Sequence, residues 1–246
     1  MIQQIAAAVF FLLIGCNQTF GQAFRSDTFL IERAKQKAQV AYQLFEGVQS
    51  RLYNGKLYRD YSIPLSEGHP YFSTDQFETG SIRYDGMFFE NVPLLYNIVS
   101  DEVITPHYNK VQWVSLRNDK IESFNFGGHQ FIRIEADSLN VDITSGLYEQ
   151  LYAGKTMALK KKSKFVVESI SNNTLIRKVK VTERHFVLHE ESWYRVTSLR
   201  SVLNVLEGHN AAIRQHLRSA KIKYRRNPDL ALASVAAYYD QLTAGK

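Results

Sequence analysis

Apolar residues near the N-terminus of the chain recur with a helical period. From Ile31 to Phe45 they are spaced three or four apart, which predicts a helix over residues 28–45 that ends near Gly47. The dipeptides Asn54-Gly55 and Asp85-Gly86 follow, each between apolar or aromatic residues. Such dipeptides are typical of the tight turns that join two antiparallel strands. The pattern therefore changes from helix to hairpins after the first fifty residues.

The middle of the chain predicts a three-stranded antiparallel meander. Its strands, joined by two-residue loops at Asn118-Asp119 and Gly127-Gly128, are Val111–Arg117, Lys120–Phe126 and His129–Glu135. Counting outward from the loops places Trp113 opposite Phe124, and Phe124 opposite Phe131. Both faces of this meander contain apolar side chains, so we expect other parts of the fold to cover it.

Strand character continues through Thr156–Glu168 and Leu175–His189, which are rich in Val, Ile, Phe and Thr. After Ser198 the apolar spacing becomes helical, and a last helix is marked by Asn227 as N-cap and Pro228 in the first turn. The sequence thus predicts an α+β fold. Its centre is an antiparallel sheet built from hairpins, with one N-terminal helix and several C-terminal helices.

The first residues have the pattern of an export signal. The uncharged apolar run Ile5–Ile14 is too short to cross a hydrocarbon core of roughly 30 Å as a helix, but it has the length of a signal-peptide core. Cleavage after Gly21 predicts a signal peptide over residues 1–21 and a mature chain over residues 22–246. In the alternative, Leu13–Cys16 is a lipobox, and Cys16, the one cysteine of the chain, is lipidated and attached to a membrane.

Length and charge then limit the domain organisation and the partners. The 225 residues after position 21 contain no Pro-, Gly- or Ser-rich linker, which favours one domain over residues 22–246. Residues 1–154 carry a net charge of −5, from 12 Lys and Arg against 17 Asp and Glu, whereas residues 155–246 carry +11, from 18 against 7. Two clusters stand out as candidate partner-binding residues: Lys160, Lys161, Lys162 and Lys164, and Lys221, Lys223, Arg225 and Arg226.

Motifs for catalysis and for metal or cofactor binding are weak. His185 and His189 stand four apart, but their neighbours alternate like a strand, which would separate the two side chains by roughly 13 Å, too far to share one ion. No Gly-x-Ser-x-Gly elbow and no glycine-rich phosphate loop occurs. His69 lies in a Gly-His-Pro turn, the most functional-looking loop of the chain. We therefore expect no metal and no cofactor.

Four segments resemble a group of exported proteins common in Bacteroidota. They are Gly80-Ser81-Ile82-Arg83-Tyr84-Asp85-Gly86, Asn91-Val92-Pro93-Leu94-Leu95-Tyr96, Leu151-Tyr152-Ala153-Gly154 and Tyr238-Tyr239-Asp240. The resemblance spans most of residues 50–243 and implies a location in the cell envelope. That group has no assigned activity, so the resemblance transfers no catalytic residues.

Two hypotheses for function follow. The first is a non-enzymatic protein of the periplasm or cell envelope that binds a macromolecular partner through its basic C-terminal third. The partner would be an envelope protein or an anionic envelope polymer; nucleic acid is not expected outside the cell, and a membrane enters only if Cys16 is lipidated. The alternative is a hydrolase or transferase that acts on an envelope polymer, with a site assembled in three dimensions.

Overall fold

The computed structural model describes residues 30–31, 33–35, 37–38, 50–59, 64–136, 143–172 and 174–244. The predicted signal peptide, with Cys16, lies outside these residues. The described residues between 30 and 38 are helical, but the rest of the helix predicted over 28–45 is not described, so that helix stays a prediction. The chain divides into two units, residues 1–50 and 51–246, and the second contains the sheet and the C-terminal helices.

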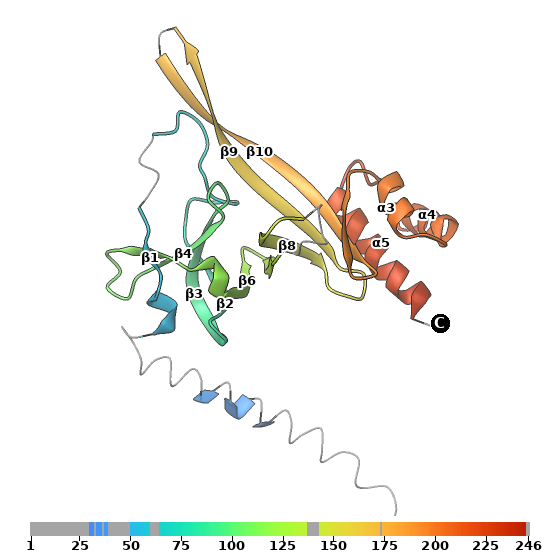
Figure 1. Ribbon diagram of the computed structural model, residues 1–246, viewed down its shortest axis with the longest axis horizontal. Helices are drawn as coiled ribbons and strands as arrows, with labels where there is room; N and C mark the ends of the chain where they lie inside the picture. The colour runs from blue at the N-terminus through green and yellow to red at the C-terminus, as the bar shows by residue number, and fades with distance from the viewer. Residues whose placement is uncertain are drawn as a thin grey trace, which may run out of the picture. The chain divides into compact units, whose positions relative to one another are not determined.

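A single antiparallel sheet dominates residues 51–246. Its eleven described strands are β1 (Lys56–Leu57), β2 (Glu78–Tyr84), β3 (Met87–Asn97), β4 (Glu102–Pro106), β5 (Trp113–Ser115), β6 (Ile121–Phe126), β7 (His129–Ile134), β8 (Gly146–Tyr152), β9 (Ala158–Ser171), β10 (Thr174–His189) and β11 (Ser192–Val196). They lie in the order β1-β5-β4-β3-β2-β6-β7-β8-β9-β10-β11 (Figure 1). The predicted antiparallel sheet is thus confirmed, but the fold is mostly β and not the α+β fold predicted, because strands fill most of the middle of the chain.

Two predicted hairpin turns are confirmed. Asp85 and Gly86 both have positive φ, 52° and 75°, as a two-residue turn requires when its twist matches the flanking strands. Gly127 and Gly128, with φ of 56° and 78°, join β6 to β7 in the same way. The register of that second hairpin is also as predicted, since Phe124 pairs with Phe131.

The first strand of the predicted meander is in the wrong place. Residues Asn118–Lys120 form a turn of 3-10 helix, η3, and neither Asn118 nor Asp119 has the positive φ of a two-residue hairpin loop. As a result β5 pairs with β4 and β1, and Phe124 of β6 pairs with Ile82 of β2 instead of Trp113. The Asn54-Gly55 hairpin is likewise wrong, because these residues follow the short 3-10 helix η2 (Arg51–Tyr53) and lead into β1.

The largest buried cluster lies on β2, β3, β6 and β7 and is aromatic at its centre. Phe124 and Phe131 stack with ring centroids 4.6 Å apart, and Tyr96 meets them edge-on at 5.4 and 5.3 Å. All three are at most 2% exposed. Burial of rings of this size supplies much of the hydrophobic stabilisation of a domain. This cluster therefore stabilises the central strands of the sheet.

Three helices cover the other end of the sheet: α3 (Leu199–Val205), α4 (Asn210–Ser219) and α5 (Pro228–Thr243). The side chain of Asn227 accepts a hydrogen bond from the Leu230 backbone N–H at 3.1 Å, as predicted for the N-cap of α5. The helices pack their apolar faces around Ala158 of β9 and Val187 of β10. None of the described helices has the length and apolar character to cross a membrane.

Two of the four segments that resemble exported proteins contact each other at α5. Asp240 of α5 accepts hydrogen bonds from the Tyr152 hydroxyl at 3.1 Å and from the Thr156 backbone N–H at 2.9 Å. Gly154 lies so close to this carboxylate that a larger residue would collide with it. The Leu151–Gly154 and Tyr238–Asp240 segments therefore have a structural role, which is to fix α5 against the turn between β8 and β9.

The strands β9 and β10 form a long hairpin that we call the arm. Their register runs from Ala158 opposite Val187 at its base to Ser171 opposite Thr174 near its tip. The base is buried beneath the helices, whereas the tip extends beyond the rest of residues 51–246 (Figure 1) and exposes apolar side chains such as Ile170, which is 78% exposed. Both strands were predicted from their composition; their projection was not.

Candidate functional site

The lysines of the first predicted cluster alternate between the two faces of β9. Lys160, Lys162 and Lys164 share one face with His185 and Glu183 of β10, and Lys161 lies on the other face. The run Lys160–Lys164 is thus not a continuous basic surface. Its four lysines instead contact three different parts of the fold.

Lys160 occupies the buried centre of a chain of ionic contacts. Its Nζ lies 2.8 Å from Glu149 Oε2 and 2.6 Å from Asp229 Oδ2, and only 7% of the Lys160 side chain is exposed. Asp229 Oδ1 is 2.7 Å from His185 Nε2, and Glu149 Oε1 is 2.6 Å from His129 Nδ1. The chain links β7, β8, β9 and β10 to the first turn of α5, where a carboxylate also interacts favourably with the helix dipole.

The charges of this chain stabilise one another. The hydrogen bond from His185, followed by that from Lys160, lowers the pKa of Asp229 from 3.8 to about 2. Burial alone would lower the pKa of Lys160, but its hydrogen bond to Asp229 and its ion pair with Glu149 outweigh burial and raise that pKa. Lys160 is therefore a charged, internally paired residue.

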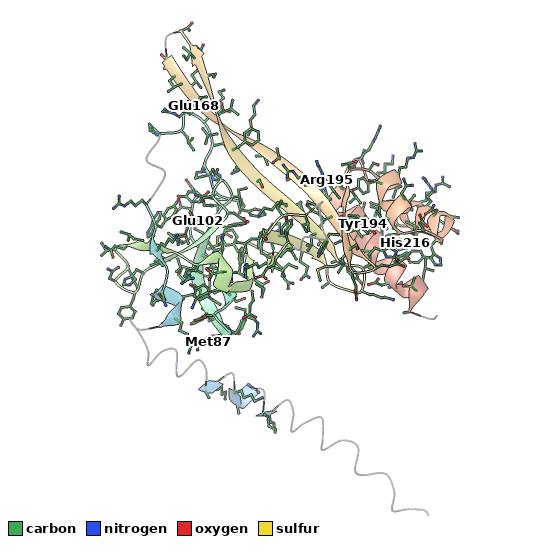
Figure 2. The ribbon with its side chains drawn as sticks, viewed as in Figure 1. Met87, Glu102, Glu168, Tyr194, Arg195 and His216 are labelled. Atoms are coloured by element: carbon green, nitrogen blue, oxygen red, sulfur yellow. The ribbon has the colours of Figure 1, made fainter. Side chains whose placement is uncertain are left out.

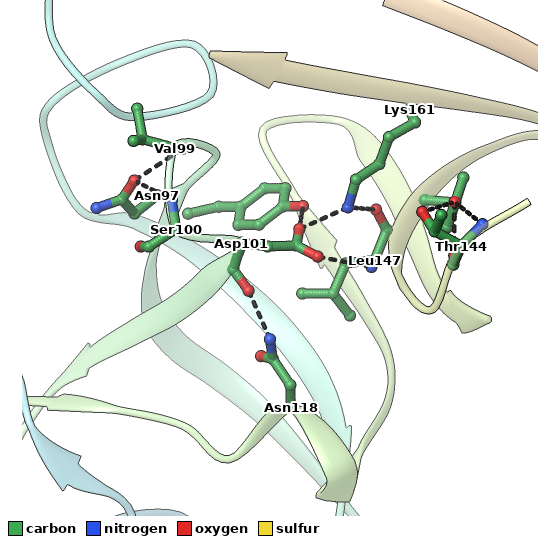
Figure 3. A network of polar contacts seen from close by, with 10 residues as sticks. Asn97, Val99, Ser100, Asp101, Asn118, Thr144, Leu147 and Lys161 are labelled. Atoms are coloured by element: carbon green, nitrogen blue, oxygen red, sulfur yellow. Dashed lines mark hydrogen bonds and ion pairs between the residues drawn. The ribbon is translucent and has the colours of Figure 1, made fainter. Parts of the chain in front are cut away.

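Lys161 belongs to a second internal network, drawn in Figure 3. Its Nζ donates to Asp101 Oδ1 at 2.7 Å and to the Leu147 carbonyl at 2.8 Å, and the Tyr96 hydroxyl donates to the same Asp101 oxygen at 2.5 Å. The ammonium also lies 5.1 Å from the ring centre of Tyr148. Burial outweighs the attraction of Asp101, so the pKa of Lys161 is lowered. Lys161 thereby joins the arm to the turn between β3 and β4.

Lys162 and Lys164 attach the arm to the segment around residue 70. Lys162 Nζ lies 5.0 Å from the ring centre of Phe72 and 3.8 Å from Glu183. Lys164 Nζ donates to the carbonyls of His69, at 3.0 Å, and Tyr71. Burial of the His69 imidazole, together with the nearby positive charge of Lys164, lowers the pKa of His69. The predicted loop of His69 is thus a support for the arm.

The second predicted cluster, by contrast, is exposed. Lys221, Lys223, Arg225 and Arg226 occupy the linker between α4 and α5, and each is exposed to solvent. Backbone hydrogen bonds from the N–H of Arg226 and of Asn227 to the Lys223 carbonyl, at 3.0 and 3.1 Å, fold this linker into turns. We call these four residues the basic linker.

A hollow of about 290 Å³ lies between the basic linker and the base of the arm. Its lining residues are Glu183, Arg184, His185, Arg195, Val196, Thr197, Tyr224 and Pro228. The Tyr224 hydroxyl is buried and has no hydrogen-bond partner within the described part of the chain. Burial, and secondarily the charge of Asp229, raises the pKa of Tyr224 to about 12, so the hydroxyl stays protonated and can donate a hydrogen bond to a bound acceptor.

A row of basic residues on the arm leads to the same hollow. Lys178, Lys180 and Arg184 are exposed and lie an even number of residues apart on β10, which places them on one face, with Thr182 between the last two. Lys180 is paired across the strands with Phe165, whose side chain is 45% exposed. Two residues along a strand span about 6.6 Å, so the row is about 20 Å long. Lys178 is 2.6 Å from Glu67, but both side chains are more than half exposed, so solvent screens that pair.

The sequence analysis missed this row of basic residues. Its signal was the alternation of basic and apolar residues within Leu175–His189, which we interpreted only as strand character. His185 and His189 do lie on a strand, as expected, and His185 is bonded to Asp229. No group of three or more His, Cys, Asp or Glu residues suited to a metal ion occurs within the described ranges.

Comparison with known proteins adds no relatives. No family model, no curated protein and no solved structure matches the chain.

Proposed function

We propose that this protein is a non-catalytic protein of the cell envelope that binds an anionic polymer along the basic face of the arm and the basic linker. The observation that carries the proposal is the convergence of two separate segments on one hollow. Arg184 and Arg195 reach it from the β10–β11 hairpin, and Tyr224, which lies between Lys223 and Arg225 of the basic linker, reaches it from the connection between α4 and α5. The envelope location rests on the apolar segment Ile5–Ile14 and on the resemblance to exported proteins.

The linear spacing of the charges favours a polymer over a compact partner. Lys178, Lys180 and Arg184 form a row about 20 Å long, which suits a chain with repeated negative charges. An extended anionic chain could follow this row into the hollow, where the Tyr224 hydroxyl lacks an acceptor among the described residues. Exposed cations of this kind contribute mainly to attraction of the partner and little to stability of the fold.

The lysines of β9 have a different part in this proposal. Lys160, Lys161 and Lys164 are bonded to other parts of the protein, so we assign them to positioning of the arm and not to the partner surface. Only the basic linker of the two predicted clusters remains in the proposed binding surface, to which the row on β10 is added.

The test compares variants of equal charge. One variant carries Lys178→Glu, Lys180→Glu and Arg184→Glu, a second carries Lys221→Glu, Lys223→Glu and Arg225→Glu, and a control reverses three exposed basic residues elsewhere: Lys56→Glu, Arg59→Glu and Lys110→Glu. All three variants change the net charge of +6 to the same extent. Any difference in their retention must therefore come from the positions of the substituted residues. The probes are immobilised dextran sulfate and polygalacturonate, with neutral dextran as a blank.

We expect the wild type and the control to stay on both anionic polymers, and the arm and linker variants to elute at lower salt. Retention should weaken as salt shortens the Debye length from about 10 Å at 0.1 M to about 3 Å at 1 M. Equal elution of all three charge-reversed variants would contradict the proposal, because it would mean that net charge alone determines retention.

A further inference from the structure

The outer edge of β9 presents backbone hydrogen-bonding groups that nothing in the described ranges satisfies. The Lys164 N–H donates to the Ile98 carbonyl at 3.0 Å, which shows that Lys164 directs its N–H away from β10. Backbone direction alternates along a strand, so Val166, Glu168 and Ile170 also direct their N–H and C=O groups outward. No backbone hydrogen bond to these three outward-facing residues is found among the described ones.

The outer edge of β10, at the same distance from the tip of the arm, has partners for its backbone groups. There the Arg177 carbonyl accepts from the Ser66 N–H at 2.9 Å, and the Val179 N–H donates to the Glu67 carbonyl at 3.4 Å. The segment around Glu67 therefore covers the β10 edge, while the β9 edge from residue 165 to residue 171 stays open in the described structure. Of the two outer edges of the arm, only the edge of β10 is therefore covered in the described structure.

The side chains of the open edge favour pairing with another strand. Residues 165–171 read Phe-Val-Val-Glu-Ser-Ile-Ser, with high β-propensity, no proline and a single charge. That charge, Glu168, lies in the distal part of the arm (Figure 2) and is bonded to Arg177 at 2.7 Å. Proteins usually protect an exposed edge with lysine, proline or a bulge. This edge has none of these devices, and its Ile170 is 78% exposed.

We propose that a second copy of this chain pairs with this edge, antiparallel and around a two-fold axis at Glu168. A second copy fits this edge because the edge is symmetric about Glu168. Val166, Glu168 and Ile170 face outward, so a two-fold axis at Glu168 places Val166 of one chain opposite Ile170 of the other, twice. Each directly hydrogen-bonded pair exchanges two bonds, so these three pairs make about six, and the two arms become one four-stranded sheet.

Neighbouring registers are less favourable. A shift of two residues toward the base would place Ile170 of the second copy opposite Lys164, whose N–H is already bonded to the Ile98 carbonyl. A shift toward the tip would leave Val166 unpaired. The cost of the central register is that Glu168 faces its own copy, but each Glu168 is bonded to an Arg177 that offsets the repulsion. A two-fold axis perpendicular to the sheet also leaves the basic rows of both arms on the same face.

The first test is the oligomeric state of the full chain by sedimentation and light scattering over a wide range of concentration. We expect a dimer for the wild type and a monomer for Val166→Pro, because proline removes an outward N–H without breaking the ladder between β9 and β10. The matched control is Val181→Pro, at an outward position on the opposite edge, which should remain a dimer. A monomeric wild type at every concentration would overturn the proposal, and so would a dimer that persists in a folded Val166→Pro variant.

The second test fixes the register without destabilising the arm. In a Cys16→Ser background, Glu168→Cys places two thiols across the two-fold axis, with Cα atoms about 5.5 Å apart, within the range that a disulfide spans. We expect a covalent dimer on mild oxidation. The control Ser171→Cys places the thiols about 20 Å apart along the paired strands and should stay unlinked. Cross-linking of Ser171→Cys in preference to Glu168→Cys would refute this register. Neither test depends on polymer binding, so the two proposals can fail separately.

Discussion

Replacing Asp229 by asparagine should lower the free energy of unfolding by about 1–2 kcal/mol at neutral pH. Asparagine has nearly the same shape but carries no charge. The substitution would leave Lys160 with Glu149 as its remaining carboxylate and His185 with an amide in place of a carboxylate. It would also remove a negative charge from the first turn of α5.

The magnitude follows from the pKa of Asp229. The pKa of this carboxyl falls from 3.8 to about 2, and at 1.36 kcal/mol per pKa unit the difference corresponds to roughly 2.4 kcal/mol. Because 34% of the side chain is exposed, solvent screening reduces this figure to about 1–2 kcal/mol. The pKa is lower in the folded protein than in the unfolded chain, so the stabilisation is complete above about pH 4 and is lost as the pH falls toward about 2.

Urea unfolding of the wild type and of Asp229→Asn at several pH values would measure this effect. The difference in unfolding free energy between the two should be largest at neutral pH and should shrink as the pH falls below about 4. Glu207→Gln, an exposed carboxylate in the same helical region, should change stability by less than about 0.5 kcal/mol. A difference between wild type and Asp229→Asn that is equally large at acidic and neutral pH would refute the electrostatic reasoning.

Three further predictions concern the core, a helix cap and export. Phe124→Ala should cost about 3–5 kcal/mol in urea unfolding, since Phe124 is 2% exposed; the exposed Phe165→Ala is the control, and an equal loss in both would contradict this view of the core. Asn227→Ala should cost about 1 kcal/mol through loss of the α5 N-cap, and an unchanged melting temperature would count against it. Intact-mass analysis of the exported protein should find an unlipidated chain that starts near Gln22, whereas an acylated Cys16 at the N-terminus would establish the lipoprotein alternative.

Local features of this chain could be predicted because they depend on neighbours in the sequence. The Asp85-Gly86 and Gly127-Gly128 turns need positive φ, which these residues adopt at low cost. The cap of α5 likewise depends on Asn227 and the residues just after it. The register of β6 against β7 followed by counting from the turn, because side chains alternate strictly along a strand.

Pairing between distant strands could not be predicted in the same way. Trp113 pairs with Pro106 of β4, and Phe124 pairs with Ile82, because Asn118–Lys120 forms a helical turn instead of a hairpin loop. Many apolar strands are compatible with one another by pattern alone, and only the assembled sheet decides which of them become neighbours.

The candidate site shows the same division between sequence and structure. The sequence by itself determined that the C-terminal third is basic, and it located the exposed basic linker. Tertiary structure decided that Lys160 and Lys161 are buried in ion pairs with Asp229 and Asp101, residues remote from them in the sequence, and that Tyr224 and Arg184 line one hollow. The physical reason is that a charge has no fixed role until the fold decides which groups surround it and how much water remains.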